Sequence, residues 1–128
     1  MSLRVALVVP DHELWSGEAD VVIAKTTEGD IGILIGHSPV FGILAEGSIA
    51  EIIGAEGSVR AAVSGGFFSV ADDQVSILAA QAQLGGEVDV EQARQELAAA
   101  LAEAVPGAED SPAVRYARAR LRAAGSQD

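Results

Sequence analysis

Apolar residues in the first part of the chain come in short runs, and turn residues such as glycine, proline and aspartate separate them. The runs hold about five residues and recur every 8–12 or so, which is typical of strands joined by tight turns and leaves no room for crossover helices. The pattern predicts an antiparallel β-sandwich or barrel. We expect strands at Leu3–Val9, Glu18–Thr26, Ile31–Ile35, Val40–Ala45, Ser48–Ile53, Ser58–Val63, Phe67–Ala71 and Gln74–Ala79.

Several of these runs, Ile31–Ile35 among them, are apolar at nearly every position. A small antiparallel sheet normally keeps one face polar and solvated. Apolar side chains on both faces therefore indicate that some outer faces of the sandwich contact another protein.

The apolar pattern takes on helical spacing after Gly85-Gly86. Asp89 is suited to cap a helix, and Glu91 follows in the first turn, where the helix dipole favours negative charge. We expect this helix to end at Val105-Pro106-Gly107. Its apolar stripe is Val90, Ala93, Leu97, Leu101 and Ala104.

Ser111 and Pro112 predict a second helix, with the serine as its cap and the proline at its first position. Two helices joined by a short loop form an αα-hairpin. The expected fold is mainly β with an α appendage: an antiparallel β-sandwich in residues 1–86, followed by an αα-hairpin domain in residues 87–128. The apolar stripe of the second helix is Val114, Ala117, Leu121 and Ala124.

The hairpin has few large apolar side chains with which to hold itself on the sandwich. Each would contribute about 1.5–3 kcal/mol if fully buried, but we expect them to be half-buried. A docking energy of a few kcal/mol is comparable with the roughly 2.7 kcal/mol that a ligand supplies at a hundred times its dissociation constant. We therefore expect a movable hairpin. The side chains are Val90, Leu97, Leu101, Val114 and Leu121.

The composition excludes several kinds of site. The 128 residues include no cysteine and only two histidines, His12 and His37, which excludes disulfides, thiolate chemistry and a multi-histidine metal site within one chain. The net charge of -11 argues against nucleic-acid binding. No apolar run approaches the ~20 residues that span a bilayer, and Met1–Val5 leads into strand-like sequence without a targeting segment. We expect a cytoplasmic, bacterial protein.

The segment Glu28–Val40 contains E-G-x-x-G-I followed by G-H-x-P, and it resembles the signature loop of the epsilon subunits of F-type ATP synthases. The similarity continues in order through Ser64–Phe67, Val75–Ala79 and Val88-Asp89, and Leu14–Gly17 is similar to the aromatic-Ser-Gly element of the family. The resemblance covers the whole chain, and ordered elements at matching separations make it specific.

The resemblance implies a non-catalytic subunit of a rotary motor. In the family, the sandwich binds the gamma subunit and rests on the ring of c subunits, and it helps to couple proton-driven rotation to ATP synthesis. The hairpin folds down on the sandwich or extends along gamma toward the alpha and beta subunits, where it restrains ATP hydrolysis. The family resemblance also implies a peripheral location at the cytoplasmic face of the bacterial plasma membrane.

The resemblance implies a c-ring contact for Asp30 and His37, at the two ends of one expected strand. Without it, Asp30 is interpreted as a turn residue and His37 as a solvated loop side chain. Gly36 permits a sharp turn and Pro39 fixes the backbone that follows, and with Ser38 they complete the candidate contact.

Weaker candidates for gamma contact are Trp15, Gly65 and Gly66. The family places the glycine doublet near the gamma-facing part of the sheet, but a bulge or a close approach of two backbones explains it equally well. Trp15 fits either a core or an interface.

ATP binding is the least favoured part of the resemblance. Nucleotide-binding members carry I/L-D-x-x-R-A at the start of the first helix. Here Asp89 and Ala93 fit this motif, but Gln92 replaces the arginine that would pair with phosphate oxygens. We expect weak or absent ATP binding and no cofactor.

Three arginines, Arg115, Arg118 and Arg122, share one face of the second helix. They are interpreted either as a solvated cationic face or as a contact with acidic loops of the beta subunit. The wider alternatives are a free-standing sandwich adaptor and a glycosidase-like enzyme. Catalysis is not favoured, because Ser38 and Ser64 have no activating partners nearby in the sequence.

Overall fold

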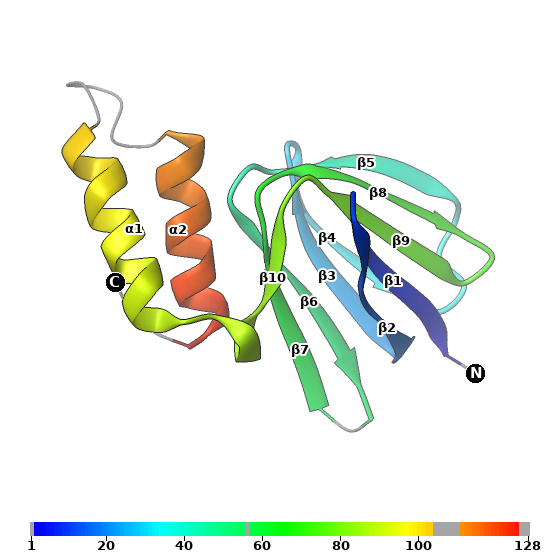
Figure 1. Ribbon diagram of the computed structural model, residues 1–128. Coiled ribbons are helices and arrows are strands. Elements are labelled where there is room, and N and C mark those ends of the chain that lie inside the picture. Colours follow the sequence, from blue (N-terminus) through cyan, green and yellow to red (C-terminus); the bar gives the residue numbers. More distant parts are fainter. Residues whose placement is uncertain (1, 56, 104–110, 126–128) are drawn as a thin grey trace.

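The computed structural model describes residues 2–55, 57–103 and 111–125, in which strands precede two α-helices (Figure 1). This order confirms the mainly β fold with a C-terminal helical hairpin. The division into domains 1–86 and 87–128 stays a prediction. The elements are β1 (Leu3–Val9), β2 (His12–Ala19), β3 (Val21–Thr26), β4 (Gly29–Leu34), β5 (Val40–Leu44), β6 (Ser48–Gly54), β7 (Gly57–Val63), β8 (Gly66–Ala71), β9 (Gln74–Ala79), β10 (Ala82–Leu84), the 3-10 turn η1 (Gly85–Glu87), α1 (Val90–Glu103) and α2 (Pro112–Ala123).

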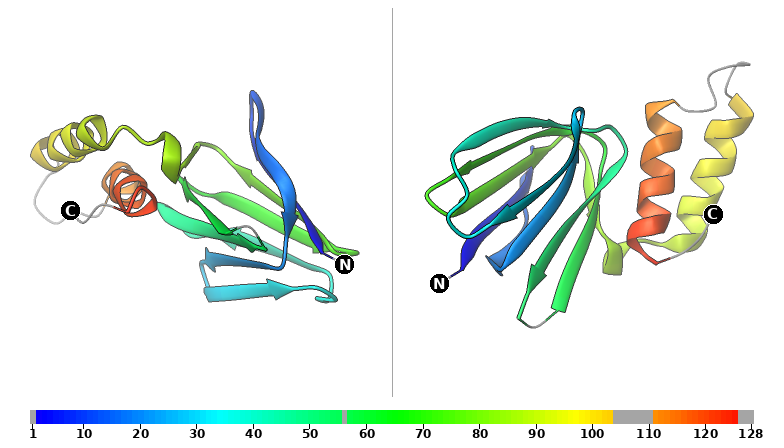
Figure 2. Two further views of the ribbon diagram at one scale, coloured as in Figure 1. Left: turned by 90° about the horizontal axis from the view of Figure 1, so that it is seen from below. Right: turned by 180° about the vertical axis from the view of Figure 1, so that it is seen from behind.

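The strands form one hydrogen-bonded path, β10-β7-β6-β3-β5-β8-β9-β1-β2, with β4 paired to β3. Between β3 and β5 the path has a single residue pair, Thr26 opposite Leu44. It bends there, so that β10, β7, β6, β3 and β4 form one layer and the remaining strands form the other (Figure 2).

Two expectations about the strands are wrong in detail. The run expected at Glu18–Thr26 is the end of β2 and all of β3, divided at Asp20, whose N–H donates to the Ile53 carbonyl at 2.7 Å. Strand β1 pairs in parallel with β9, whereas the other pairings among the described strands are antiparallel. A parallel pair needs a long connection, and here the connection is most of the sandwich.

Inward-facing side chains of both layers form a common core. Alternate residues of β1 (Leu3, Val5 and Leu7) are fully buried, and Phe68 of β8 is the largest side chain among the fully buried residues. This period of two is what packs one face of each strand against the opposite layer.

Both expected helix caps are present. The Asp89 carboxylate accepts from the Gln92 N–H at 3.1 Å, and the Ser111 hydroxyl accepts from the Val114 N–H at 3.4 Å. Each cap satisfies a backbone donor that the first helical turn leaves unpaired. Two expected features of the first helix, Ala104 in its stripe and its end at Val105-Pro106-Gly107, lie outside the described residues.

Helix α2 lies between α1 and the sandwich (Figures 1 and 2). On one side, Ala119 and Ala123 pack on Ala62 of β7. The opposite side packs with α1 through Val114, Ala117 and Leu121.

The expectation of half-burial is wrong for three of the five large apolar side chains in the hairpin. Val114 and Leu121 of α2 are fully buried because that helix is covered on two sides, and Leu97 of α1 is buried against them. Val90 and Leu101 are partly buried, as expected.

Candidate interaction surfaces

The segment Gly36–Pro39 is an ordered turn that follows β4. The N–H of Gly36, whose φ is 84°, donates to Asp73 Oδ1 at 2.7 Å. The N–H of His37 donates to the Leu34 carbonyl at 3.1 Å, and its ring Nδ1 lies 2.7 Å from the Ser38 carbonyl oxygen. His37 is half-buried, whereas Gly36, Ser38 and Pro39 are exposed. The turn is therefore held in shape while most of it faces solvent.

Asp73 is a supporting residue that the sequence analysis missed. It belongs to the two-residue turn between β8 and β9, where Asp72 and Asp73 have φ angles of 52° and 59°. Two residues with positive φ are typical of a tight hairpin turn, and aspartate tolerates that conformation better than most residues. Asp72 and Asp73 stand between two apolar runs, which indicates a hairpin turn in the sequence. The contact of Asp73 with Gly36, by contrast, depends on the tertiary structure.

Asp30 does not join this turn. It lies in β4 opposite Lys25 of β3, and its side chain is exposed. At about 3.3 Å per residue, the strand places Asp30 roughly 13 Å from Leu34, where the turn begins. The predicted c-ring residues therefore lie at two separate positions on the sandwich.

The candidates for gamma contact have local structural explanations. Gly66 opens β8 with a φ of 142°, and a Cβ there would lie 2.0 Å from the Leu78 carbonyl oxygen, so two backbones meet closely at this point. Gly65 also has a positive φ, 145°. Trp15 is half-buried against the sandwich core, beside Gly17 of the same strand.

One outer face of the sandwich carries large exposed apolar side chains, as the sequence predicts. Ile43, Phe67 and Leu78 lie side by side on β5, β8 and β9, because Ile43 pairs with Phe67 and Phe67 pairs with Leu78. The ring of Phe41 lies 5.3 Å from that of Phe67. Phe41, Ile43, Phe67 and Leu78 are called the outer apolar surface below.

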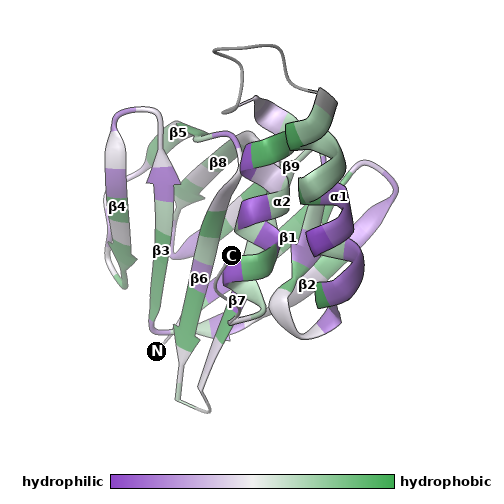
Figure 3. Cartoon of the chain, turned by 90° about the vertical axis from the view of Figure 1, so that its left-hand side faces the viewer, coloured by the Kyte–Doolittle hydropathy of each residue, from purple (hydrophilic) through white to green (hydrophobic). Residues whose placement is uncertain are grey.

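Apolar residues are also exposed on the opposite layer, in the run Ile31–Ile35. Leu34 and Ile43 are equally exposed, at 58% each. Ile33, by contrast, is fully buried. Figure 3 shows green, apolar stretches along β3 and β6 of this layer.

A second surface is a charged groove of about 460 Å³ beside α2. Arg115 and Arg122 line it from α2, and Asp30 lines it from β4. The groove therefore brings together residues that the sequence analysis assigned to different partners. Its other charged lining residues are Lys25, Glu46, Glu51 and Arg60. Arg118, the third arginine of the predicted face, is half-buried and is not among the lining residues.

The residues of the nucleotide-motif region have structural roles within the hairpin. Asp89 caps α1, and Ala93 is fully buried against α2. The side-chain amide of Gln92 donates to Glu96 Oε1 at 3.1 Å.

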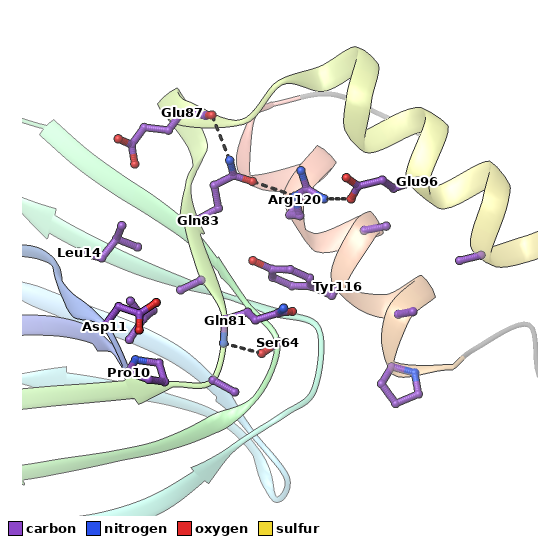
Figure 4. Close-up of a pocket in the computed structure, with 17 residues that line it drawn as sticks. Pro10, Asp11, Leu14, Ser64, Gln81, Gln83, Glu87, Glu96, Tyr116 and Arg120 are labelled. Carbon is purple, nitrogen blue, oxygen red and sulfur yellow. Dashed lines mark hydrogen bonds and ion pairs between the residues drawn. The ribbon is translucent and has the colours of Figure 1, made fainter.

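Arg120 is the most deeply buried charged residue that the structure describes, and the sequence analysis missed it. Only 8% of it is exposed. Its Nε donates to Gln83 Oε1 at 2.8 Å, and its Nη1 forms an ion pair with Glu96 Oε2 (Figure 4). In the sequence, Arg120 lies one helical turn after Tyr116 and one residue before Leu121, a member of the predicted apolar stripe. This position is the sequence signal that could have indicated its burial.

Arg120 lines a cavity of about 1010 Å³ between the hairpin and the sandwich. Its guanidinium carbon lies 5.8 Å from the centre of the Tyr116 ring. Burial raises the pKa of Tyr116, an effect that Arg120 opposes and Glu96 reinforces. Within the described residues no buried side-chain nitrogen or oxygen lacks a hydrogen-bond partner.

The described part of the chain holds neither a candidate metal site nor a membrane-spanning helix. No group of three or more His, Cys, Asp or Glu side chains is arranged to hold a metal ion. Neither helix combines the length and the apolar character needed to span a membrane.

Residues 2–85 match the family model of the β-sandwich domain of the ATP synthase delta/epsilon chain. The chain is 54% identical to the ATP synthase epsilon chain of Thermobifida fusca over 129 residues, covering 98% of this chain and 94% of that one. Its identity to the epsilon chain of Streptomyces coelicolor is 46% over 125 residues, covering 98% and 97%.

Solved structures of rotary ATP synthases contain chains of similar fold. A chain in the OSCP/F1/c-ring structure of Euglena gracilis mitochondrial ATP synthase has a TM-score of 0.69 and 25% identity, covering 94% of this chain and 75% of that chain. A chain in the central stalk and c-ring structure from Tetrahymena thermophila has a TM-score of 0.56 and 20% identity, covering 72% and 73%.

Proposed function

The chain belongs to the ATP synthase epsilon-chain family, and from that premise we propose that its sandwich binds the gamma subunit and the c-subunit ring, and that its helices restrain ATP hydrolysis. As an epsilon chain it is a subunit of the central stalk of ATP synthase. Family membership also removes the free-standing adaptor as an alternative.

The outer apolar surface is the observation that carries the proposed gamma contact. Its row of Ile43, Phe67 and Leu78 crosses three adjacent strands and leaves a continuous apolar strip facing solvent. Such strips on small soluble domains mark sites of protein association. Gly66 is next to this row, since it pairs with both Leu44 and Ala79, which supports a weak role for the Gly65-Gly66 corner. Trp15 stays a weak candidate.

Two matched serine substitutions test this contact. Ile43→Ser on the outer apolar surface and Leu34→Ser on the opposite layer remove side chains of similar size and equal exposure. Removing an interface residue of this size costs about 1–2 kcal/mol, so Ile43→Ser should weaken co-purification with gamma roughly tenfold. Leu34→Ser should leave it unchanged. Equal retention of gamma by both variants would place the contact elsewhere.

We propose the Gly36–Pro39 turn as the main contact with the c ring. Asp73 holds the turn in shape, so that little conformational freedom is lost when it binds. Asp30 lies at the other end of β4 and is proposed as a separate contact, because a ring of identical subunits can present its loops at more than one position.

The remaining parts of the proposal concern the hairpin and the location. Arg115, Arg118 and Arg122 contact acidic loops of the beta subunit when the helices extend toward alpha and beta. The chain is non-catalytic and needs no cofactor, and ATP binds weakly because Gln92 is neutral and pairs with Glu96. The complex places the chain peripherally at the cytoplasmic face of the bacterial plasma membrane.

A further inference from the structure

One buried guanidinium connects three elements at the junction of hairpin and sandwich. Arg120 of α2 donates to Gln83 of β10 at 2.8 Å and pairs with Glu96 of α1. In Figure 4 the two contacts lie on opposite sides of the guanidinium, with Gln83 on the sandwich side and Glu96 on the α1 side.

The partners of Arg120 are themselves held in place. Gln83 Nε2 donates to the Glu87 carbonyl at 3.1 Å, which leaves Gln83 Oε1 to accept from Arg120. Gln92 Nε2 donates to Glu96 Oε1, which leaves Glu96 Oε2 for Arg120. The neutral amide at position 92 thus orients Glu96 without adding a second cation that would compete for it.

We propose that Arg120 couples two contacts of the hairpin. Through Arg120, the docking of the hairpin on the sandwich depends on the contact between α1 and α2. Glu96 fixes the guanidinium, and the fixed guanidinium holds Gln83. If the hairpin lifts as a unit, only the bond to Gln83 breaks; if α1 leaves α2, the ion pair breaks as well.

The energetic reason is the burial of the charge. A hydrogen bond to a charged group is worth more than one between neutral groups, and a buried charge without its counter-ion is strongly destabilising. Arg120 itself is only 8% exposed, so loss of Glu96 would leave a largely buried guanidinium without its anionic partner. Opening the hairpin therefore also weakens its hold on the sandwich, and the two events become coupled.

The test uses the full chain alone and rests on no part of the proposed function. Because the chain has no cysteine, Ala62→Cys introduces a single thiol. Ala62 is fully buried beneath Ala119 and Ala123, so the thiol reacts with a labelling reagent only when α2 lifts. When reclosing is faster than labelling, the rate reports the open fraction.

In this background, Gln83→Met removes the acceptor and keeps the length of the side chain. We expect labelling to accelerate about tenfold or more, as for the loss of a hydrogen bond to a charged group. Arg120→Met should accelerate it at least as much. The matched control is Arg94→Met, the same substitution in α1 at an exposed residue that pairs with Glu91 at 4.0 Å. Labelling in this control should change by less than about twofold.

Coupling is the decisive readout. Gln83→Met and Glu96→Gln alter the two side chains that bond to Arg120, so their combined effect on the rate should be several-fold smaller than the product of the separate effects. In the Arg120→Met background this difference should vanish. A simple product with Arg120 intact, or a Gln83→Met rate equal to that of Arg94→Met, would overturn the proposal. If Arg120→Met fails to fold, the comparison of Gln83→Met, Glu96→Gln and their combination decides alone.

Discussion

Gly85→Ala should separate α2 from the sandwich by adding a single methyl group. A Cβ at Gly85 would lie 2.1 Å from the carbonyl oxygen of Ala123, near the C-terminal end of α2. Ordinary contact needs about 3.4 Å, and the obstacle is backbone, which no side-chain rotation can move aside. Helix α2 must therefore shift by about 1 Å or more.

This shift would disrupt the interface between α2 and β7 of the sandwich. Ala119 and Ala123 pack on Ala62, and a gap of about 0.5–1 Å already loses a quarter to a half of the dispersion energy of such contacts. Overpacking of this kind costs about 1–3 kcal/mol. Each 1.4 kcal/mol corresponds to roughly tenfold in the docking equilibrium, so the open fraction should rise about tenfold to a hundredfold.

Trp15 provides the assay, since it is the only tryptophan and lines the same cavity of about 390 Å³ as Gly85 and Ala123. Undocking should shift its emission to the red and increase quenching by acrylamide. Gly86→Ala is the matched control, because a Cβ at Gly86 has no atom within 4 Å. Both substitutions stiffen the unfolded chain equally, so that effect cancels. Identical emission and quenching in the two variants would refute the reasoning.

Three further predictions concern the hairpin. Charge reversal of Arg115, Arg118 and Arg122 should release ATP hydrolysis by the reconstituted catalytic head, and unchanged inhibition would remove these arginines from the contact. Titration calorimetry of the isolated chain with MgATP should show weak or no binding, because Gln92 supplies no charge, and micromolar affinity would contradict this. Burial raises the pKa of Tyr116 above 10.0. The docked form is therefore stabilised at lower pH, and this contribution is lost as the pH rises above about 10 through the raised pKa. Tyr116→Phe should remove that pH dependence of Trp15 emission.

Local signals predicted many element boundaries. Leu3–Val9 and Gln74–Ala79 are strands with the predicted limits, and Asp89 and Ser111 cap the two helices as predicted. These features depend on neighbouring residues, so a single sequence contains the information. Most of β2, up to Gly17, was not predicted because its polar residues hide the alternation, and β10 was not predicted because it has only three residues.

The candidate site was harder to predict, because it depends on contacts between distant residues. Gly36 was recognised as a turn residue, but nothing near it indicated that Asp73 would accept its N–H. In the sequence, Arg120 is one of several arginines on a predicted helix. Its distinctive environment comes from Gln83 and Glu96, which are both far away in sequence.

The most direct measurement of the central claim is the rate of ATP hydrolysis by the purified catalytic head, reconstituted with the full chain or with a chain that ends at Glu87. The family model matches residues 2–85, so the shorter chain keeps the sandwich and should bind gamma equally well. The account predicts several-fold faster hydrolysis with the shorter chain. Equal rates at equal occupancy would contradict a restraining role for the helices.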